Sequence, residues 1–318
     1  MRTLTVEQAL EEALFEEMAH DSRVLTLGEC VAETWSKLRE TYGPQRVRNT
    51  PLAEGIIAGT AVGAAAMGLR PVIDLLAAPF LLYAMEEIVN SAGKLRYMSG
   101  GQFSFPLVVL ARIGTGVAMG AQHIHNLEAW FAHAPGLKVV VPSSAAEAKG
   151  LLKAAIRDEN PVLLFRDFVQ GYVPAEVPEG EHVIPLGKAA VVRSGQSATI
   201  VTYGRMVHTA LEAAATLAEQ GFSTEVLDLR TIKPLDEEAV LASVRKTGRL
   251  VVVHEASRMC GVGAEIAAIV AEKAFGALKA PILRLTGPDV PVPASPALES
   301  LFAPGATQIV QAVRQLVG

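Results

Sequence analysis

The sequence contains few of the residues that build thiolate or nucleic-acid sites. Only two cysteines, Cys30 and Cys260, occur in 318 residues, without a CxxC pair or a zinc-ligand spacing. Two free thiols are typical of a protein in a reducing compartment. Aromatic residues make up 5% and the formal net charge is -5, so neither the basic surface nor the stacking side chains of nucleic-acid binding are present. We therefore expect a cytoplasmic protein with no nucleic-acid partner.

Charged residues are also sparse, at 19%, whereas half of the residues are hydrophobic. The longest weakly polar run, residues 55–69, nevertheless has only about 15 residues, and a membrane-spanning helix needs about 20. We interpret this run as a buried helix. In residues 1–21 acids interrupt the apolar positions, which indicates an amphipathic helix rather than a signal peptide. No membrane partner is expected, and the apolar surplus favours a large core or an oligomer.

Short apolar runs alternate with helix-like segments along the chain, a pattern typical of a parallel sheet with helices on both faces. The pattern is interrupted at residues 171–188, where prolines, glycines and mixed charges indicate a linker. The sequence therefore predicts an α/β fold with two domains, residues 1–180 and 190–318, on either side of this linker.

Glu54 is the first candidate for chemistry. It follows Pro51 at the expected start of a helix and precedes a face of isoleucine, alanine and glycine. A capping box from Thr50 would need its acid at position 53, which is Ala53, so the register is off by one. A carboxylate among small apolar residues is costly unless it is paired or protonated. The residues alone support a functional site and a structural role about equally.

A second candidate is a glycine-rich loop after a strand-like segment. The dinucleotide fingerprint GxGxxG would start at Gly114 and Gly116, but Met119 stands where the third glycine is required. The pair Gly261 and Gly263 lacks its third glycine as well. We expect these loops to lie near a ligand, but the sequence does not predict nicotinamide binding.

Three of the seven histidines gather in residues 121–135. His123 and His125 have the H-x-H spacing, and His133 lies in the last turn of a short helix that Asn126 would cap. A zinc site needs three or four convergent ligands, and neither a carboxylate nor a cysteine motif accompanies the pair. We therefore favour packed histidines or a proton-transfer role over a transition-metal site.

Longer motifs run through the whole chain in a characteristic order. They are NTPLAE (49–54), GLRPVID (68–74), IVNSAGKLRYMSGG (88–101), GAQH (120–123), FAHAPGLKVVVP (131–142) and TGPDVPVPASPALE (286–299). Their order and spacing make the chain similar, essentially from end to end, to the β subunits of thiamine-diphosphate-dependent 2-oxo acid dehydrogenases. This family includes the pyruvate, branched-chain and acetoin dehydrogenase complexes. The resemblance implies two three-layer α/β domains, a pyrimidine-binding domain and a transketolase C-terminal-like domain.

By position, the resemblance implies that Glu54 hydrogen-bonds the pyrimidine N1′ atom of thiamine diphosphate and that Phe80 packs on that ring. Glu29 would lie near the cofactor. His123 matches the family's catalytic histidine, which stabilises a developing alkoxide and assists proton transfer. His125 stands where relatives commonly have glutamine, and its role stays open.

The resemblance also implies a monovalent-cation site, usually for potassium, largely through backbone oxygens. By position it would fall on Leu107, Ala155, Asp158 and Asn160. The alternative is that Asp158 and Asn160 simply stabilise the turn after the preceding helix.

In this family a GDG motif of the α subunit holds Mg²⁺ and the diphosphate, and no GDG occurs in this sequence. The resemblance therefore implies an oxidoreductase of two α and two β chains. It would decarboxylate a small 2-oxo acid, pyruvate or a branched-chain one, and pass the acyl group to a lipoylated acyltransferase core. Three alternatives stay open: an acetoin dehydrogenase β subunit, a split transketolase subunit and a non-catalytic scaffold.

Overall fold

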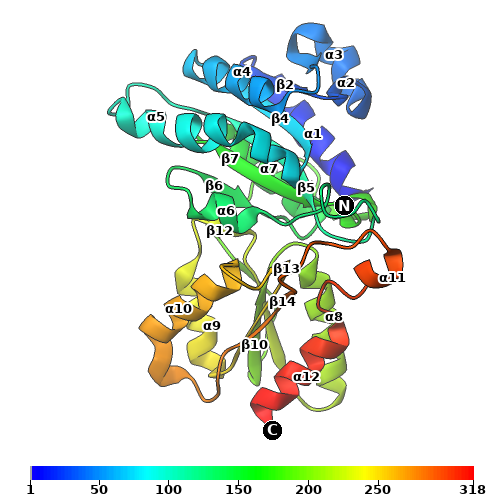
Figure 1. Ribbon diagram of the computed structural model, residues 1–318, viewed down its shortest axis with the longest axis vertical. Helices are drawn as coiled ribbons and strands as arrows, with labels where there is room; N and C mark the ends of the chain where they lie inside the picture. The colour runs from blue at the N-terminus through cyan, green and yellow to red at the C-terminus, as the bar shows by residue number, and fades with distance from the viewer. Residues whose placement is uncertain (1) are drawn as a thin grey trace. The chain divides into compact units, whose positions relative to one another are not determined.

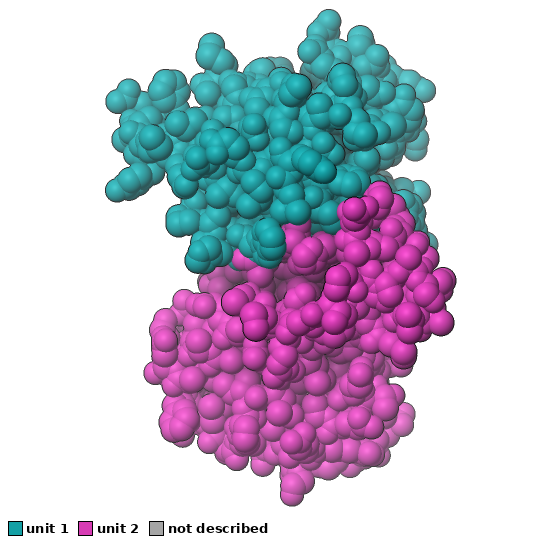
Figure 2. Space-filling view, in the orientation of Figure 1, with its two compact units in different colours: residues 1–113, 130–186 teal, residues 114–129, 187–318 magenta. Residues whose placement is uncertain are grey.

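The computed structural model describes residues 2–318, which form two compact units (Figure 2). Unit 1 contains the chain up to Ile113 and residues Trp130–Leu186, and unit 2 contains Gly114–Ala129 and Gly187–Gly318. The segment Gly114–Ala129 therefore groups with the C-terminal unit, although the expected bounds of 1–180 and 190–318 assigned it to the N-terminal domain. This segment carries His123 and His125.

Unit 1 is built on a sheet in which the neighbouring strands are parallel. Most of the strand residues are buried, as expected for parallel strands covered on both faces. The strands are, in spatial order, β6 (Lys138–Val140), β7 (Val162–Asp167), β5 (Val108–Ile113), β4 (Arg70–Ala77), β2 (Val24–Gly28) and β3 (Val47–Asn49) (Figure 1).

Helices α1 (Val6–His20) and α7 (Ala145–Arg157) pack against each other, and their buried residues share one core with the strands. A capping box between Thr5 and Gln8 starts α1. The other helical segments of unit 1 are α2 (Val31–Thr34), α3 (Ser36–Arg46), α4 (Glu54–Ala66), η1 (Ala78–Ala84), η2 (Glu86–Ala92), α5 (Gly93–Met98) and η3 (Gln170–Tyr172). Helix α6 (Glu128–His133) begins in the segment that belongs to unit 2.

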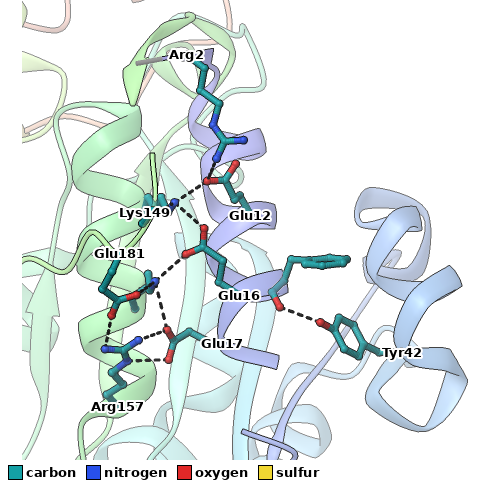
Figure 3. Close-up of polar contacts among 11 residues, drawn as sticks. Arg2, Glu12, Glu16, Glu17, Tyr42, Lys149, Arg157 and Glu181 are labelled. Atoms are coloured by element: carbon teal, nitrogen blue, oxygen red, sulfur yellow. Dashed lines mark hydrogen bonds and ion pairs between the residues drawn. The ribbon is translucent and has the colours of Figure 1, made fainter. Parts of the chain in front are cut away.

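A ladder of ion pairs joins α1 to α7 (Figure 3). Its cations lie four residues apart on α7, at Lys149, Lys153 and Arg157, and both lysine side chains are almost fully buried. Their carboxylate partners are Glu12, Glu16 and Glu17 on α1 and Glu181 in the segment that follows β7. The ladder therefore joins α1 to α7 along three successive turns of α7.

Helix α4, which the sequence predicted to be buried, is covered on one side only. Ile57, Ala58 and Ala61 are buried, whereas the side chain of Ile56 is 73% exposed. Small residues continue around the helix, so its sequence pattern does not show which face is covered. No helix among residues 2–318 combines the length and apolar character needed to cross a membrane.

The segment expected as a linker is largely packed onto unit 1. Its strand β8 (Ala175–Val177) pairs with β1 (Arg2–Leu4), and Val177 and Ile184 are buried in the core. The C-terminal part of unit 2 begins only at Gly187. The prolines and glycines of this stretch thus accompany a short strand and turns that return along unit 1.

Unit 2 has a second sheet, in which the edge strand β9 is antiparallel and the other neighbours are parallel. Helices α8 and α12 share a core with one face of the sheet, and α9 packs against α10 (Figure 1). The strands are β14 (Leu283–Gly287), β13 (Leu250–Ser257), β10 (Ala198–Thr202), β11 (Thr224–Asp228) and β9 (Ala190–Arg193), with the short β12 at Thr231–Lys233. The helices are α8 (Met206–Glu219), α9 (Glu237–Thr247), α10 (Val262–Ala274), η4 (Phe275–Ala277), α11 (Pro296–Glu299) and α12 (Ala306–Val317). The α/β class with two domains is thereby confirmed.

Candidate functional site

Three predicted site residues lie at one edge of the unit 1 sheet. Glu29 directly follows β2, Glu54 is the first residue of α4 after β3, and Phe80 lies in η1 after β4. Because β3, β2 and β4 are parallel neighbours, their carboxyl ends meet at the same edge, where α/β proteins bind ligands. The sheet thus places Glu29, Glu54 and Phe80 at the same edge.

Glu54 does not belong to a capping box. The residue before the helix, Ala53, makes no side-chain cap, and the buried Thr50 hydroxyl has no hydrogen-bond partner among the described residues. The first turn of α4 approaches η1 closely at Gly55, where a Cβ would lie 2.9 Å from the Tyr83 carbonyl oxygen. The Glu54 carboxyl therefore lies at a helix N-terminus, beside the segment that carries Phe80, and does not serve to start the helix.

Two buried polar atoms at this edge are without partners within residues 2–318: Oε2 of Glu29 and Oγ1 of Thr50. Buried polar atoms are normally hydrogen-bonded, and an exception in a site indicates a group supplied from outside the chain. A polar, hydrogen-bonding ligand therefore fits this edge.

The turn that leads to Phe80 is fixed by a buried pair that the sequence reasoning missed. Leu76 has a left-handed φ of 60°, and its N–H donates to Oδ1 of Asp74 at 3.0 Å. The other Asp74 oxygen accepts from the fully buried guanidinium of Arg166 at 2.6 Å. The sequence did contain a signal for this pair, because a charged residue interrupts each of the apolar strand runs 72–77 and 162–167. Buried charges occur in pairs, so two such interruptions indicate partners.

His123 lies in unit 2, on the loop 114–126. Gly114, Gly116 and Gly120 all have positive φ, at 93°, 111° and 75°, so these glycines shape the loop. Asn126, which was expected to cap the following helix, instead closes the loop by accepting the Gly114 N–H at 2.9 Å, and α6 begins at Glu128. The loop holds His123 in a partly buried position.

His125 lines a cavity of about 580 Å³ within unit 2, together with Asn126, Glu255, Asp289 and Phe302 among others. Burial lowers the pKa of His125, so its ring is neutral at pH 7 and can accept as well as donate a hydrogen bond. Among residues 2–318, no three histidine, cysteine or acidic side chains are grouped to hold a metal.

His133, the last residue of α6, is exposed. The second glycine pair also has a packing role. A Cβ on Gly261 or Gly263 would lie within 3 Å of the His254 ring, whose Nδ1 is 3.2 Å from the Ala256 carbonyl oxygen. Burial lowers the pKa of His254 to about 4, so the ring is neutral. These glycines admit a buried imidazole.

Leu107, Ala155, Asp158 and Asn160 all belong to unit 1, and oxygens of all four already accept hydrogen bonds. The Ala155 carbonyl accepts the Asp158 N–H at 3.2 Å, and Oδ1 of Asp158 accepts the Asn160 N–H at 2.9 Å. The Leu107 carbonyl accepts the Val162 N–H at 2.9 Å.

The side chains at this place are paired with cations of the chain itself. Lys138 forms an ion pair with Asp158, and Arg96 donates to Oδ1 of Asn160 at 2.7 Å. A bound potassium ion would therefore depend on the second lone pairs of the carbonyl oxygens. The side-chain oxygens do not form an open ligand set.

Two family models together match most of the chain. The transketolase pyrimidine-binding domain matches residues 2–167, and the transketolase C-terminal domain matches residues 187–309. The gap between the two matches coincides with the stretch that was expected as a linker.

Curated relatives cover the whole chain. The β subunit of acetoin:2,6-dichlorophenolindophenol oxidoreductase from Cupriavidus necator is 46% identical, over 99% of this chain and 97% of the relative. The pyruvate dehydrogenase E1 β subunit of Rhizobium meliloti is 44% identical, over 99% and 70%. The 2-oxoisovalerate dehydrogenase β subunit of Bacillus subtilis is 43% identical, over 99% of both chains.

A solved structure described as an inactive β4 tetramer of a split-gene transketolase superposes with a TM-score of 0.83 at 27% identity, over 99% of this chain and 98% of that one. The fold and the sequence thus point to one group of proteins. The chain belongs to the transketolase-like family of β subunits of thiamine-diphosphate-dependent 2-oxo acid dehydrogenases.

Proposed function

We propose that this chain, with an α partner, catalyses thiamine-diphosphate-dependent oxidative decarboxylation of a small 2-oxo acid and delivers the acyl group to a lipoyl domain. The observation that carries the proposal is the edge of the unit 1 sheet at which Glu29, Glu54 and Phe80 lie, with the Glu29 Oε2 and Thr50 Oγ1 atoms left without partners within residues 2–318. Relatives that act on pyruvate, 2-oxoisovalerate and acetoin by name support the same class of reaction.

When bound, thiamine diphosphate supplies a carbanion nucleophile and an electron sink for the loss of CO₂. Glu54 would bond the pyrimidine N1′ atom and favour the tautomer that can remove a proton. Phe80 would pack on the pyrimidine ring, and Glu29 would accept a hydrogen bond at its buried oxygen. His123 would donate to the substrate oxygen as negative charge develops on it and move a proton during acyl delivery.

An α partner agrees with an apolar surface on unit 1. Large apolar side chains are exposed there on α4, η1 and α5 and next to them, whereas single-chain proteins rarely expose large contiguous apolar areas. These residues are Leu52, Ile56, Met67, Leu82, Tyr83, Tyr97, Met98 and Phe103. We infer an assembly of two α and two β chains, in which the partner holds Mg²⁺ and a lipoylated acyltransferase core receives the acyl group. A potassium ion on the carbonyl oxygens of the 155–160 turn and a cytoplasmic location remain predictions.

The three relatives differ little in identity, so they do not decide between pyruvate, a branched-chain 2-oxo acid and acetoin. The acetoin relative has the highest identity of the three, which keeps acetoin as the second candidate. A split transketolase subunit remains the alternative that the superposed structure suggests.

The test is co-expression of the chain with its α partner, followed by reduction of an artificial electron acceptor with pyruvate, 2-oxoisovalerate or acetoin, with and without thiamine diphosphate. We expect cofactor-dependent reduction with one of the three. Ketol transfer between sugars without acceptor reduction would identify a transketolase subunit. Cofactor binding without any turnover would identify a scaffold.

A further inference from the structure

Two buried glutamates of unit 2 accept hydrogen bonds from the backbone of the His123 loop (residues 114–126). Glu299 accepts the Gly116 N–H with Oε1 at 2.8 Å and the Ala118 N–H with Oε2 at 2.9 Å. Glu255 accepts the Thr115 N–H at 2.5 Å. Both glutamate residues are at most 5% exposed. Three N–H groups within four residues are thus bound by carboxylates from distant parts of the sequence.

Arg205 completes this arrangement. Its guanidinium forms an ion pair with Glu255 at 2.5 Å and donates to the Thr115 carbonyl oxygen at 2.7 Å. Glu255 lies in β13, Glu299 ends α11, and Arg205 immediately precedes α8. Three separate elements of unit 2 therefore converge on the same short piece of backbone.

The loop needs such external support. Gly114, Gly116 and Ala118 have positive φ values, and alanine at 55° is in a region that L-residues rarely occupy. Asn126 holds the base of the loop, a turn at Gly120 follows, and the two glutamates and Arg205 bind the backbone between them. Strained backbone persists only where surrounding groups determine it.

We propose that Glu255 and Glu299 are positioning residues that hold the His123 loop in the conformation required for turnover. The inference rests on the proposed function of His123, and it adds two further residues of unit 2 to those that support the reaction. Glu299 has the stronger claim, because each of its two oxygens takes a different N–H of the loop and charge-assisted bonds of this kind are short and directional.

The experiment uses the assembled α and β chains with Glu299→Ala and Glu299→Gln. Glutamine retains one acceptor oxygen but places an NH₂ group against the second N–H, so Glu299→Gln should retain part of the support of the loop. We expect the turnover number to fall on the order of 10²-fold for alanine and by about tenfold for glutamine, because small displacements of a reacting group are costly. The dissociation constant of thiamine diphosphate should stay within about twofold of wild type, since the cofactor-binding residues Glu54 and Phe80 belong to unit 1.

A double-mutant cycle separates positioning from general support of the fold. If Glu299 acts through His123, Glu299→Ala should cause no further loss of turnover in a His123→Ala background. The matched control is Glu225→Gln, because Glu225 is as deeply buried in unit 2 but binds Ser243 and Lys246 rather than the loop. Additive losses in the cycle, or a loss for Glu225→Gln as large as that for Glu299→Gln, would overturn the proposal.

Hydrogen exchange of peptides that cover residues 114–126 gives a readout that does not depend on turnover. Glu299→Ala should speed exchange of the Gly116 and Ala118 amides by at least about tenfold, while peptides of β10 and β11 keep wild-type rates. Unchanged exchange in the loop would refute the positioning role even if turnover fell. If the wild-type assembly showed no activity but this exchange difference appeared, the proposed function would fail and the structural inference would stand.

Discussion

In unit 1 the buried acids Asp74 and Glu17 face guanidinium groups, whereas in unit 2 the buried Glu299 faces backbone N–H groups of a loop. An ion pair between two regular elements fixes how those elements pack. A carboxylate that accepts loop N–H groups fixes a conformation that the loop would not keep by itself. The partner atoms of a buried acid, and not its burial, therefore indicate whether it supports the fold or the site, and Asp74 does both because it binds Arg166 and the Leu76 N–H.

The largest expected effect concerns Glu54, which is assigned neither an ion pair with a guanidinium group nor bonds to a loop backbone. Glu54→Gln should remove the proton-accepting oxygen at the N1′ atom, so that proton exchange at C2 of bound thiamine diphosphate is lost and turnover falls by roughly 10²–10⁴-fold. The assembled enzyme is mixed with D₂O, the exchange is stopped with acid, and the C2 proton that remains is measured by NMR. Assembly with the α partner should be unchanged.

Glu265→Gln is the matched control, because Glu265 also lies in the first turn of a helix, α10, but is exposed. Wild-type C2 exchange in Glu54→Gln would remove this residue from the mechanism. A loss in both variants would show that any first-turn glutamate matters only for its helix.

The second prediction tests the ion-pair side of the comparison in unit 1. Arg166→Met should lower the free energy of unfolding by about 3–5 kcal/mol, because Asp74 is left buried without its cation, whereas Glu7 keeps its ion pair with Arg112. Denaturant unfolding measures the loss. Adding Asp74→Leu should restore part of the stability, since an apolar replacement of the whole pair removes the unpaired charge.

The double variant should nevertheless bind thiamine diphosphate more weakly, because the Leu76 N–H loses Oδ1 of Asp74 and the turn to Phe80 loosens. If the double variant recovered both stability and cofactor affinity in full, Arg166 and Asp74 would support the packing of unit 1 but not the cofactor site.

The third prediction concerns Glu128, which is fully buried in unit 2 and accepts from the Tyr203 hydroxyl at 2.7 Å. Burial raises the pKa of Glu128 to about 7, and the hydrogen bond from Tyr203 only partly offsets this. The folded state therefore keeps a proton that the unfolded state loses near pH 4.5, and stability declines as the pH rises through this window to about 7.

Glu128→Gln carries no charge and keeps an acceptor for Tyr203. Relative to wild type it should gain stability between pH 4.5 and 7, to a limit of roughly 3 kcal/mol at about 1.36 kcal/mol per pH unit. Unfolding of both proteins at several pH values checks this. A difference that does not change with pH would mean that Glu128 is ionised in the folded protein.

The sequence predicted much of the fold and of the unit 1 site because both depend on local patterns. Alternating apolar runs specify parallel strands, and Glu29, Glu54 and Phe80 follow three of those strands directly. The family resemblance supplied their roles. The side on which α4 is covered could not be predicted, because alanine and glycine surround that helix.

The support of the His123 loop could not be predicted either. Glu255 and Glu299 lie about 140 and 180 residues after the amides they bind, and no pattern in their own segments distinguishes them from surface acids. Backbone donors leave no trace in the sequence, so a carboxylate that accepts them has no partner residue to look for. The glycines of the loop indicated an unusual backbone, and what holds that backbone depends on tertiary structure.

The smallest expected effect tests the exposed end of the unit 1 ladder. The Lys153 ammonium and the Arg157 guanidinium lower the pKa of Glu181 to about 2, yet the Glu181 side chain is 61% exposed. Solvent screening limits such a pair to about 0.2–1 kcal/mol. Glu181→Gln should lose this amount above pH 4.5, and the difference from wild type should disappear as the pH falls to about 2, because wild-type Glu181 then becomes protonated as well.

Salt separates the two kinds of acid in one measurement. The loss in Glu181→Gln should shrink between 0.05 and 1 M salt, where the Debye length falls to about 3 Å, and Glu176→Gln on the exposed side of β8 should show no loss at any salt concentration. Any loss of unfolding free energy in Glu299→Gln should persist at high salt, because the bonds of Glu299 to the Gly116 and Ala118 N–H groups are buried. A salt-sensitive Glu299→Gln would mean that solvent reaches the loop, and the two units would then use their acids in the same way.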